Sequence, residues 1–215
     1  MRSREVVNAR AIGKRKIAPE NYLIMCEGKE TEPNYFNGLK QLINSKYGDK
    51  VDVLIPEINI KGTGKNTNDL VNYTERFVNQ AGKKYGKVWI VFDKDDYRDI
   101  QFNLAIKKAT DANYNTAWSN PCFEIWLLLH LKSVQNYIEK DKILNELDKE
   151  FKHNNLGNYH KNDKDVFKKV TKDDNLSKAI TNSKKLVEKF KDKKPSESNP
   201  MTNVYKIVED LKEYI

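Results

Sequence analysis

The chain has 215 residues, of which 38% are hydrophobic and 33% charged, and its net charge at pH 7 is +8. This length suits one compact domain with an appended region, and the periodic apolar segments together with an aromatic content of 10% exclude a generally disordered chain. The excess of basic residues favours a polyanionic partner such as nucleic acid, because binding phosphates releases counterions, although solubility alone is an alternative explanation.

Secreted and membrane proteins are disfavoured by the same composition. The two cysteines, Cys26 and Cys122, lie in apolar runs, and a secreted disulfide scaffold would carry more of them. No apolar stretch reaches the roughly 20 residues that a membrane helix needs, and the basic residues 1–20 lack the apolar segment of a secretion signal. We therefore expect a cytoplasmic protein without a membrane partner, with residues 1–20 as a mobile basic arm.

Short apolar runs alternate with helical periodicity in the first half of the chain. The runs predict strands over residues 21–26, where Glu27 and Gly28 stop the apolar run, and over residues 51–60, 88–92 and 115–120. Helical spacing of apolar residues predicts helices over residues 31–48, 70–81 and 99–112. Pro56 would suit an edge position or a bulge. This alternation requires right-handed crossovers and predicts an α/β fold with a mostly parallel central sheet and flanking helices.

Beyond Pro121 the sequence predicts helices only. Pro121 would occupy the first position of an apolar helix that ends at Leu131, with Ser119 or Asn120 as its N-cap. Further helices are predicted over residues 176–190 and 204–215, joined by the polar linker 191–200. The predicted organisation is a basic arm (1–20), an α/β core (21–130) and a helical C-terminal region packed on the core (131–215).

Acidic residues follow the first and third predicted strands. Ligands of open α/β sheets bind beyond the carboxyl ends of the strands, where the sequence places Glu27, Asp93 and Asp95. If the chain stays extended through Lys94, Asp93 and Asp95 lie on one side and can share a cation, while Asp96 faces away as an outer or turn-capping acid. Clustered carboxylates would have raised pKa values unless Mg²⁺ or Mn²⁺ neutralised them. A solvated turn is the alternative interpretation.

Basic and polar residues near these acids are candidates for substrate contacts. Lys29 and Lys94 would bind a phosphate or form salt bridges with the same carboxylates. A helix capped by Ser119 or Asn120 would point free backbone N–H groups at an anion. Glu124, in the first turn of that helix, is either a further metal ligand or a buried acid paired with a lysine.

The loop KGTGKNT, residues 61–67, is glycine-rich but does not match the P-loop pattern, so we do not infer ATP binding. Its lysines Lys61 and Lys65 are candidates for phosphate contacts, and a flexible connector is the alternative. Lys161, beside Tyr159 and His160, is a further candidate, with a solvated helix start as its alternative.

Four residues of the apolar segment around Pro121 are interpreted as core. Trp118, Phe123 and Trp126 are expected to pack in the interior rather than to stack on bases, and His130 is expected to be a hydrogen-bonded core residue rather than a base.

Two sets of motifs resemble known families. Glu27-Gly28 after the first strand and Asp93-Lys94-Asp95 after the third resemble the Toprim pattern of topoisomerases, primases and overcoming-lysogenization-defect nucleases. More closely, the segments MCEGKETEPNYFNGLK, VWIVFDKDDY and WSNPCFEIWLLLHL, with the later NP and VYKIVEDL, resemble the RloB-like family over residues 22–211. Toprim loops often continue with a glycine where this chain has Asp96, so a different local turn is expected.

The resemblance implies a small bacterial protein of antiphage defence and abortive infection, with a Toprim-like fold and an AAA or SMC-like ATPase encoded nearby. It implies a Mg²⁺- or Mn²⁺-dependent nuclease acting on DNA or RNA, in which Glu27 is a ligand or general base and Asp93 and Asp95 are ligands. Lys29 or Lys94 would stabilise charge on the phosphate.

Two functions other than a nuclease are also considered for this sequence. A non-catalytic module that binds nucleic acid or a partner ATPase is the alternative from another class. A topoisomerase or primase activity is disfavoured, because the chain lacks the length for the additional domains that those reactions need.

Overall fold

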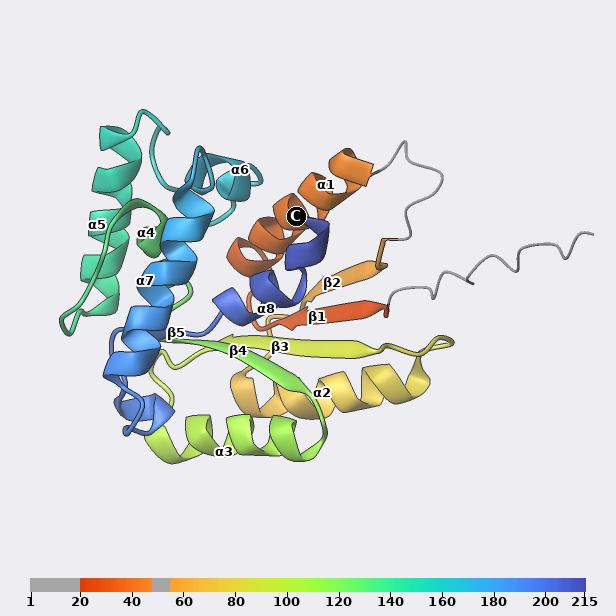
Figure 1. The fold of residues 1–215 in the computed structure, drawn as a ribbon. Helices are drawn as coiled ribbons and strands as arrows, with labels where there is room; N and C mark the ends of the chain where they lie inside the picture. Colours follow the sequence, from red (N-terminus) through yellow and green to blue (C-terminus); the bar gives the residue numbers. More distant parts are fainter. Residues whose placement is uncertain (1–19, 48–54) are drawn as a thin grey trace, which may run out of the picture.

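The computed structural model describes residues 20–47 and 55–215 (Figure 1). All but the last residue of the predicted basic arm, and the start of the second predicted strand, lie outside the described residues. The described strands form a five-stranded sheet of order β2-β1-β3-β4-β5. They are β1 (Tyr22–Cys26), β2 (Ile58–Gly62), β3 (Lys87–Asp93), β4 (Asn115–Asn120) and β5 (Met201–Thr202). Strands β1 to β4 are parallel and β5 is antiparallel to β4. The predicted α/β class is confirmed, and the sheet is consistent with a Toprim-like fold.

The central strands are buried on both faces, which explains their uninterrupted apolar sequences. All five residues of β1 and five successive residues of β3 are buried. Tyr22 of β1 is in register with both Ile58 of β2 and Lys87 of β3, so the three strands start at the same level. Their carboxyl ends therefore meet at one edge of the sheet, where the chain continues into Glu27 after β1.

Helices cover both faces of the sheet. Helix α1 (Thr31–Tyr47) lies on one face, and α2 (Thr67–Gln80) and α3 (Asp99–Asp111) lie on the other (Figure 1). All three helices were predicted. Helix α2 begins three residues before its apolar stripe because the Asn66 side chain caps it, accepting a hydrogen bond from the Asp69 backbone N–H.

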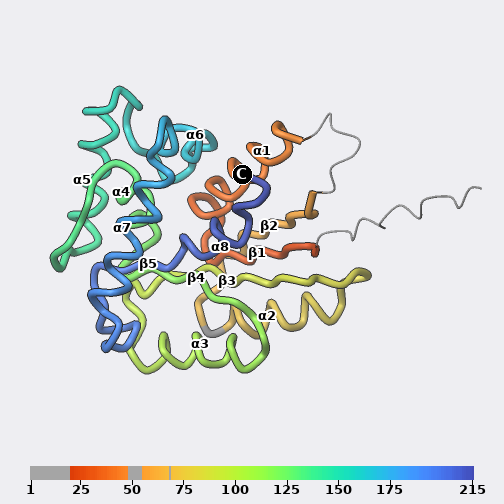
Figure 2. The backbone as a smooth tube through the Cα atoms, in the orientation of Figure 1, coloured from red at the N-terminus to blue at the C-terminus, as the bar shows by residue number. Residues whose placement is uncertain are grey.

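The remaining helices gather mainly beyond the carboxyl ends of the strands (Figure 1). They are α4 (Glu124–Leu131), α5 (Lys140–His153), α6 (Val166–Val170), α7 (Asn175–Lys189) and α8 (Tyr205–Asp210), with short 3-10 turns at Pro195–Glu197 and Lys212–Tyr214. Helix α4 packs between α5 and α7, and α6 packs on α1. The C-terminus returns to α1, where the Lys46 ammonium donates to the Ile215 carbonyl (Figure 2). In the described part of the chain, no helix combines the length and apolar character needed to cross a bilayer.

The expectation of helices only beyond Pro121 is wrong, because β5 joins the sheet beside β4. The Asn203 side chain accepts a hydrogen bond from the Trp118 backbone N–H (2.6 Å) and donates to the Thr116 carbonyl (3.2 Å). These bonds satisfy backbone groups of β4 on the side where β5 is only two residues long. A strand of two residues is too short to show the alternation of apolar and polar residues by which strands are predicted.

The predicted N-cap of the apolar helix is also wrong. Ser119 and Asn120 are the last residues of β4, the Asn120-Pro121 peptide bond is cis, and α4 begins only at Glu124. The Ser119 hydroxyl is hydrogen-bonded to that of Thr202 in β5 (3.0 Å), so the sheet and not the helix uses this side chain.

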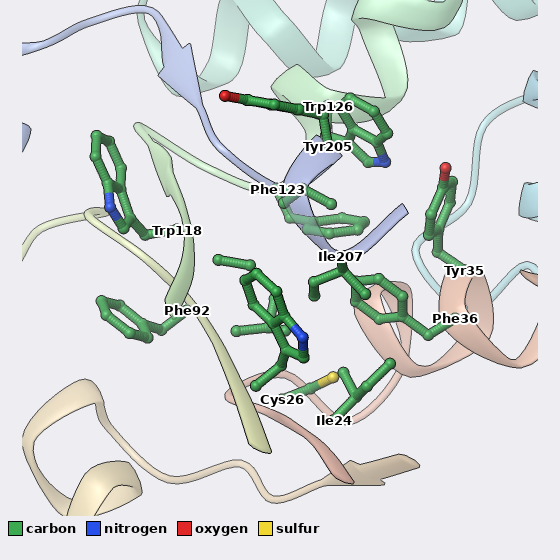
Figure 3. Close-up of a cluster of buried hydrophobic side chains, with 14 of the residues drawn as sticks. Ile24, Cys26, Tyr35, Phe36, Phe92, Trp118, Phe123, Trp126, Tyr205 and Ile207 are labelled. Atoms are coloured by element: carbon green, nitrogen blue, oxygen red, sulfur yellow. The ribbon is translucent and has the colours of Figure 1, made fainter. Parts of the chain in front are cut away.

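Aromatic packing fixes the start of α4 against α1. Phe123 and Trp126 point toward Tyr35 and Phe36 of α1, with Ile207 of α8 beside them (Figure 3). The Tyr35 ring meets those of Phe123 and Trp126 edge to face, at centroid distances of 5.8 and 6.1 Å. The prediction that Phe123 and Trp126 belong to the core is confirmed, as it is for Trp118, which is 5% exposed. This packing holds Glu124, which lies between the two aromatic residues, at the end of the sheet.

Helix α1 approaches α6 closely at Gly38, and a substitution at this position tests the contact. A Cβ atom at this position would lie 2.3 Å from Cβ of Phe167. We predict that Gly38→Ala lowers the free energy of unfolding by about 1–3 kcal/mol, because this overpacking outweighs the usual gain from replacing a helical glycine. Urea unfolding measures the change. Gly82→Ala is the control, since a Cβ there meets nothing within 4 Å; an equal effect of the two substitutions would contradict the packing.

Candidate functional site

An open cleft of about 480 Å³ lies at the carboxyl end of the sheet. We call it the acidic cleft. Its acidic lining residues are Glu27, Glu30, Glu32, Asp93, Asp95 and Glu124, and its basic ones are Lys29, Lys140 and Lys161. The acids predicted at the ends of β1 and β3 thus line one cleft, together with Glu30, Glu32 and Lys140, which were not predicted.

Asp93, the last residue of β3, is the most unusual group in the acidic cleft. Its Oδ1 atom is shielded from solvent and has no hydrogen-bond partner among the described residues. Burial, followed by the charges of Glu32 and Glu124, raises the pKa of Asp93 well above its usual range, and the charge of Glu27 adds to the effect. A hydrogen bond from the Phe123 backbone acts in the opposite direction, and the charge of Lys140 offsets part of the repulsion. A proton or a divalent cation would relieve the remainder. Asp93 thus offers an unused carboxylate oxygen in a strongly negative environment.

Glu32 approaches the cleft from the first turn of α1 and is 6% exposed. Its Oε1 atom accepts a hydrogen bond from the Gly28 backbone N–H (3.2 Å). A Cβ atom at position 28 would lie 2.1 Å from Oε2 of Glu32, so only glycine permits this approach. Burial, followed by the charge of Glu124, raises the pKa of Glu32 to about 7. The spacing of Glu32 and Phe36, four residues apart, could have indicated that Glu32 shares the inward face of the helix.

Glu27 is held firmly by hydrogen bonds. Its Oε1 atom accepts from the Tyr97 hydroxyl (3.0 Å). Its Oε2 atom accepts from the Thr67 hydroxyl (3.1 Å) and from the Asp93 backbone N–H (3.3 Å). Burial raises the pKa of Glu27, and these hydrogen bonds, the largest being that of Tyr97, act in the opposite direction. The carboxylate is therefore fixed in orientation between the ends of β1 and β3.

Glu124 enters the cleft from the first position of α4 and is 3% exposed. Its Oε1 atom accepts a hydrogen bond from the Tyr159 hydroxyl (3.1 Å) and lies 3.6 Å from Nζ of Lys161. The lysine is 54% exposed and can swing away into solvent. Both sequence interpretations of Glu124 thus have support: it lines the cleft as a ligand would, and it pairs with a lysine.

The chain is not extended at Asp95, so the condition under which it was predicted to share a cation with Asp93 is not met, although both residues line the acidic cleft. The chain turns after Lys94, and Asp95 takes a left-handed conformation with φ of 39°. Its backbone N–H donates to the Pro121 carbonyl (2.8 Å), and its carboxylate accepts from Nζ of Lys140 at 2.6 and 2.7 Å. Asp95 itself adopts the left-handed backbone conformation, which aspartate tolerates better than most residues other than glycine. Lys140, the first residue of α5, is thus a cation built into the acidic cleft.

The same turn places Asp96 and Lys94 outside the lining of the acidic cleft. Asp96 is exposed on the far side of the turn. The Lys94 ammonium donates to the Tyr97 carbonyl and lies 3.2 Å from Oδ1 of Asp99, at the start of α3. Lys94 therefore forms a salt bridge, which was one of its two predicted roles, but with an acid other than the expected ones.

The other predicted substrate contacts divide into two groups. Lys29 and Lys161 line the acidic cleft, whereas Lys61 and Lys65 lie outside its lining. Ser119 and Asn120 do not present a helix N-terminus to it, because the Asn120 amide donates to the carbonyls of Pro195 and Ser196, both at 3.1 Å.

His130 is hydrogen-bonded in the core, as the sequence predicted. Its Nε2 atom lies 3.2 Å from the Tyr35 hydroxyl, and its Nδ1 atom lies 2.9 Å from the Trp126 carbonyl. Burial lowers the pKa of His130 to about 4, so the imidazole is neutral at physiological pH. This histidine faces the core and not the acidic cleft.

The family of the chain follows from a match to the model described as RloB-like protein, which covers residues 22–211. The chain belongs to the RloB-like family. The matched range contains every residue of the acidic cleft. Neither the curated proteins nor the solved structures include a significant match to this RloB-like protein.

The acidic cleft of this RloB-like protein has the donor chemistry that Mg²⁺ or Mn²⁺ prefers, which is carboxylate oxygen. Within residues 20–47 and 55–215, however, no group of three or more His, Cys, Asp or Glu side chains is arranged to hold a metal ion. Mg²⁺ commonly takes only one or two protein carboxylates and completes its shell with water and substrate oxygens. The orphaned Oδ1 of Asp93 fits such a partial site, with Glu32 or Glu124 as a second donor.

The raised pKa of Glu32 predicts the pH dependence of stability of this RloB-like protein in EDTA. The folded state, with a pKa of about 7, binds a proton that the unfolded state, with a pKa near 4.5, has lost. The contribution of Glu32 to the free energy of unfolding is therefore greatest below pH 4.5 and decreases by up to about 3 kcal/mol as the pH rises to about 7.

Urea unfolding of wild type and Glu32→Gln over this pH range measures the effect. The variant should lose the part of the decrease that Glu32 contributes, while the raised pKa values of Asp93 and Glu27 keep a decrease in both proteins. His130, with its lowered pKa, contributes the opposite slope to both proteins, so the difference between them reports Glu32 together with the effect of its charge on Asp93. Parallel pH profiles for the two proteins would show that Glu32 is not held in this environment.

Proposed function

We propose that this RloB-like protein is a divalent-cation-dependent phosphodiesterase that hydrolyses nucleic acid. The observation that carries the proposal is the Asp93 carboxylate, which has one oxygen that is shielded from solvent and unpaired among the described residues and which lies within the field of three other acids. A fold gains nothing in stability from such a group, and perturbed carboxylates in a cleft are typical of active sites. The resemblance to defence nucleases supports a role in antiphage defence with an ATPase partner.

The acids of the cleft would have different roles. Asp93 would be the principal ligand. Glu32 or Glu124, whose charges act most strongly on Asp93, would be the second donor. When bound, Mg²⁺ or Mn²⁺ would polarise the scissile phosphate and lower the pKa of an attacking water. Glu27 is held in one orientation by Tyr97 and is suited to accept the proton of that water.

The lysines of the cleft would bind the substrate. Lys29 is exposed on the lining, and Lys161 can leave Glu124 for a phosphate oxygen because its side chain is 54% exposed. Asp95 would not be a metal ligand, which is the role that the sequence suggested. It would hold Lys140 in the cleft, where the ammonium balances part of the negative charge.

The first test replaces Asp93. We predict that Asp93→Asn abolishes cleavage of plasmid, single-stranded DNA and tRNA pools, measured with Mg²⁺ and Mn²⁺ and with or without the product of the neighbouring ATPase gene. Saturation with Mn²⁺ should stabilise the wild type by about 2.7 kcal/mol at 100 times its Kd, and the variant should lose this gain. In EDTA the variant should be at least as stable as the wild type, because it removes the repulsion.

Asp111→Asn is the matched control, because Asp111 is an exposed acid of α3 that pairs with Lys107 away from the cleft. It should cleave and bind Mn²⁺ as the wild type does. A wild type that cleaves none of these substrates, or an Asp93→Asn variant that cleaves normally, would refute the proposal.

The second test replaces the built-in cation. Lys140→Met removes a positive charge from the cleft and frees the Asp95 carboxylate. We predict that its affinity for Mn²⁺ rises about fivefold, which corresponds to roughly 1 kcal/mol of relieved repulsion. Isothermal titration measures the affinity, and Lys140→Arg, which keeps the charge, should stay close to the wild type. Unchanged or weaker binding in Lys140→Met would show that the cation does not bind beside Lys140.

A non-catalytic binding module is the second candidate function. It is favoured by the internal hydrogen bonds that already occupy Glu27 and by the salt bridge of Asp95. If the protein binds nucleic acid but the titration detects no Mn²⁺ binding, this alternative replaces the enzyme.

A further inference from the structure

Three aromatic rings form a row on the side of the sheet that α2 covers. Tyr73 and Phe77, one turn apart on α2, have ring centroids 6.4 Å apart and planes inclined by 32°. Phe77 and Tyr85, in the turn before β3, repeat the same separation and inclination. The core rings pack differently: Tyr35 and Phe36, for example, meet at 90°. The three residues of the row pack against the core and are only partly buried.

Each ring of this row has one lysine over it. Nζ of Lys65 lies 4.9 Å from the Tyr73 centroid. Nζ of Lys61 lies 5.7 Å from that of Phe77, and Nζ of Lys83 lies 5.5 Å from that of Tyr85. We call these six residues the aromatic-lysine ladder.

The lysines of the ladder leave a net positive charge. Lys61 and Lys65 form no salt bridge with any residue in the described ranges, and Lys83 pairs with Glu57. Two of the three positive charges are therefore available to an anion. The aliphatic part of a lysine side chain can cover an aromatic ring while its ammonium stays in solvent, where it can contact a phosphate.

The ladder begins next to the acidic cleft. The loop that contains Lys65 is fastened to Glu27 at two points. The Gly64 backbone N–H donates to the Glu27 carbonyl (2.7 Å), and the Thr67 hydroxyl donates to the Glu27 carboxylate (3.1 Å). From there α2 runs from the carboxyl ends of the strands toward their opposite ends (Figure 1). Lys61 lies in β2, the edge strand, so no further described strand covers this side.

We infer that the aromatic-lysine ladder binds single-stranded nucleic acid and leads it to the acidic cleft. Accessible aromatic faces combined with lysines are the two elements by which proteins bind single strands without sequence preference. A duplex keeps its bases stacked on one another, so it could use the lysines but not the rings. The destination of the strand rests on the proposed function, whereas its binding to the ladder does not.

The experiment measures fluorescence anisotropy of a labelled oligothymidylate of about 20 nucleotides, and of a duplex of the same length, with the full chain in EDTA. The wild type should bind the single strand more tightly than the duplex. The double variant Lys61→Gln and Lys65→Gln should bind it more weakly. The slope of its log affinity against log salt should become shallower by about 1.4, which is about 0.7 for each phosphate that a lysine no longer neutralises.

Phe77→Leu tests the stacking separately, because it keeps an apolar side chain and removes the ring. Its affinity for the single strand should fall about 5- to 150-fold, with much less effect on the duplex. Thermal unfolding of each variant separates a binding defect from a folding defect.

The control is Lys184→Gln, whose ammonium also lies over a ring, 5.6 Å from the Tyr205 centroid, but away from the ladder. It should bind as the wild type does. The inference is overturned if the wild type prefers the duplex or binds neither, or if the ladder variants bind the single strand as tightly as Lys184→Gln. Because EDTA removes the cation, a ladder that binds single strands in a protein without nuclease activity would refute the proposed function alone.

Discussion

Asp93 ends a buried strand within the field of three other carboxylates, and this repulsion is the constraint on which the remaining structure of the site depends. The position is imposed by the sheet: β3 is buried through Phe92, and its register with β1 brings Asp93 beside Glu27. Glu32 and Glu124 then approach from the starts of α1 and α4. The cost of holding these charges together can be removed by a proton or by a cation, and the unpaired Oδ1 of Asp93 is suited to either. A basic protein could have placed a lysine against Asp93, yet Lys140 contacts Asp95 instead.

The helical second half of the chain is part of the site and not merely attached to it. Phe123 and Trp126 pack on α1, and this aromatic contact sets the distance between Glu32 on one helix and Glu124 on the other (Figure 3). Helix α5 contributes Lys140 from its first position, and the segment before α6 contributes Lys161. The acids thus come from the sheet and its neighbouring helices, whereas the cations come mainly from the later part of the chain. A change in the packing of the second half would alter the charge balance of the acidic cleft.

The sequence predicted the parallel sheet, three of its first four strands and the gathering of acids at the strand ends, because apolar runs and helical periodicity are local signals and because ligand sites of open α/β sheets follow the strand ends. It predicted Glu27 and Asp93 for the same reason. The second strand is displaced: β2 covers Ile58–Gly62 and takes in Lys61, which was assigned to a loop. The sequence did not predict Glu32, since the direction in which a helix turns its first residues depends on what it packs against. The pairing of Asp95 with Lys140 was not predicted, because the backbone turns left-handed at Asp95 and Lys140 lies 45 residues away in sequence. The two-residue β5 is set by hydrogen bonds to β4, and the start of α4 at Glu124 by the packing of Phe123 and Trp126 on α1. Neither leaves a periodic signal in the sequence.

The aromatic-lysine ladder and the acidic cleft share Glu27, so one continuous path would lead from a basic edge to an acidic centre. In the proposed mechanism a divalent cation completes the environment of Asp93. Anomalous X-ray scattering from crystals grown with Mn²⁺ tests this most directly. We predict a peak within bonding distance of the Asp93 carboxylate, with Glu32 or Glu124 as a second protein donor. A map with the cleft empty at saturating Mn²⁺, or with Mn²⁺ bound only at other acids of the surface, would contradict the proposed mechanism.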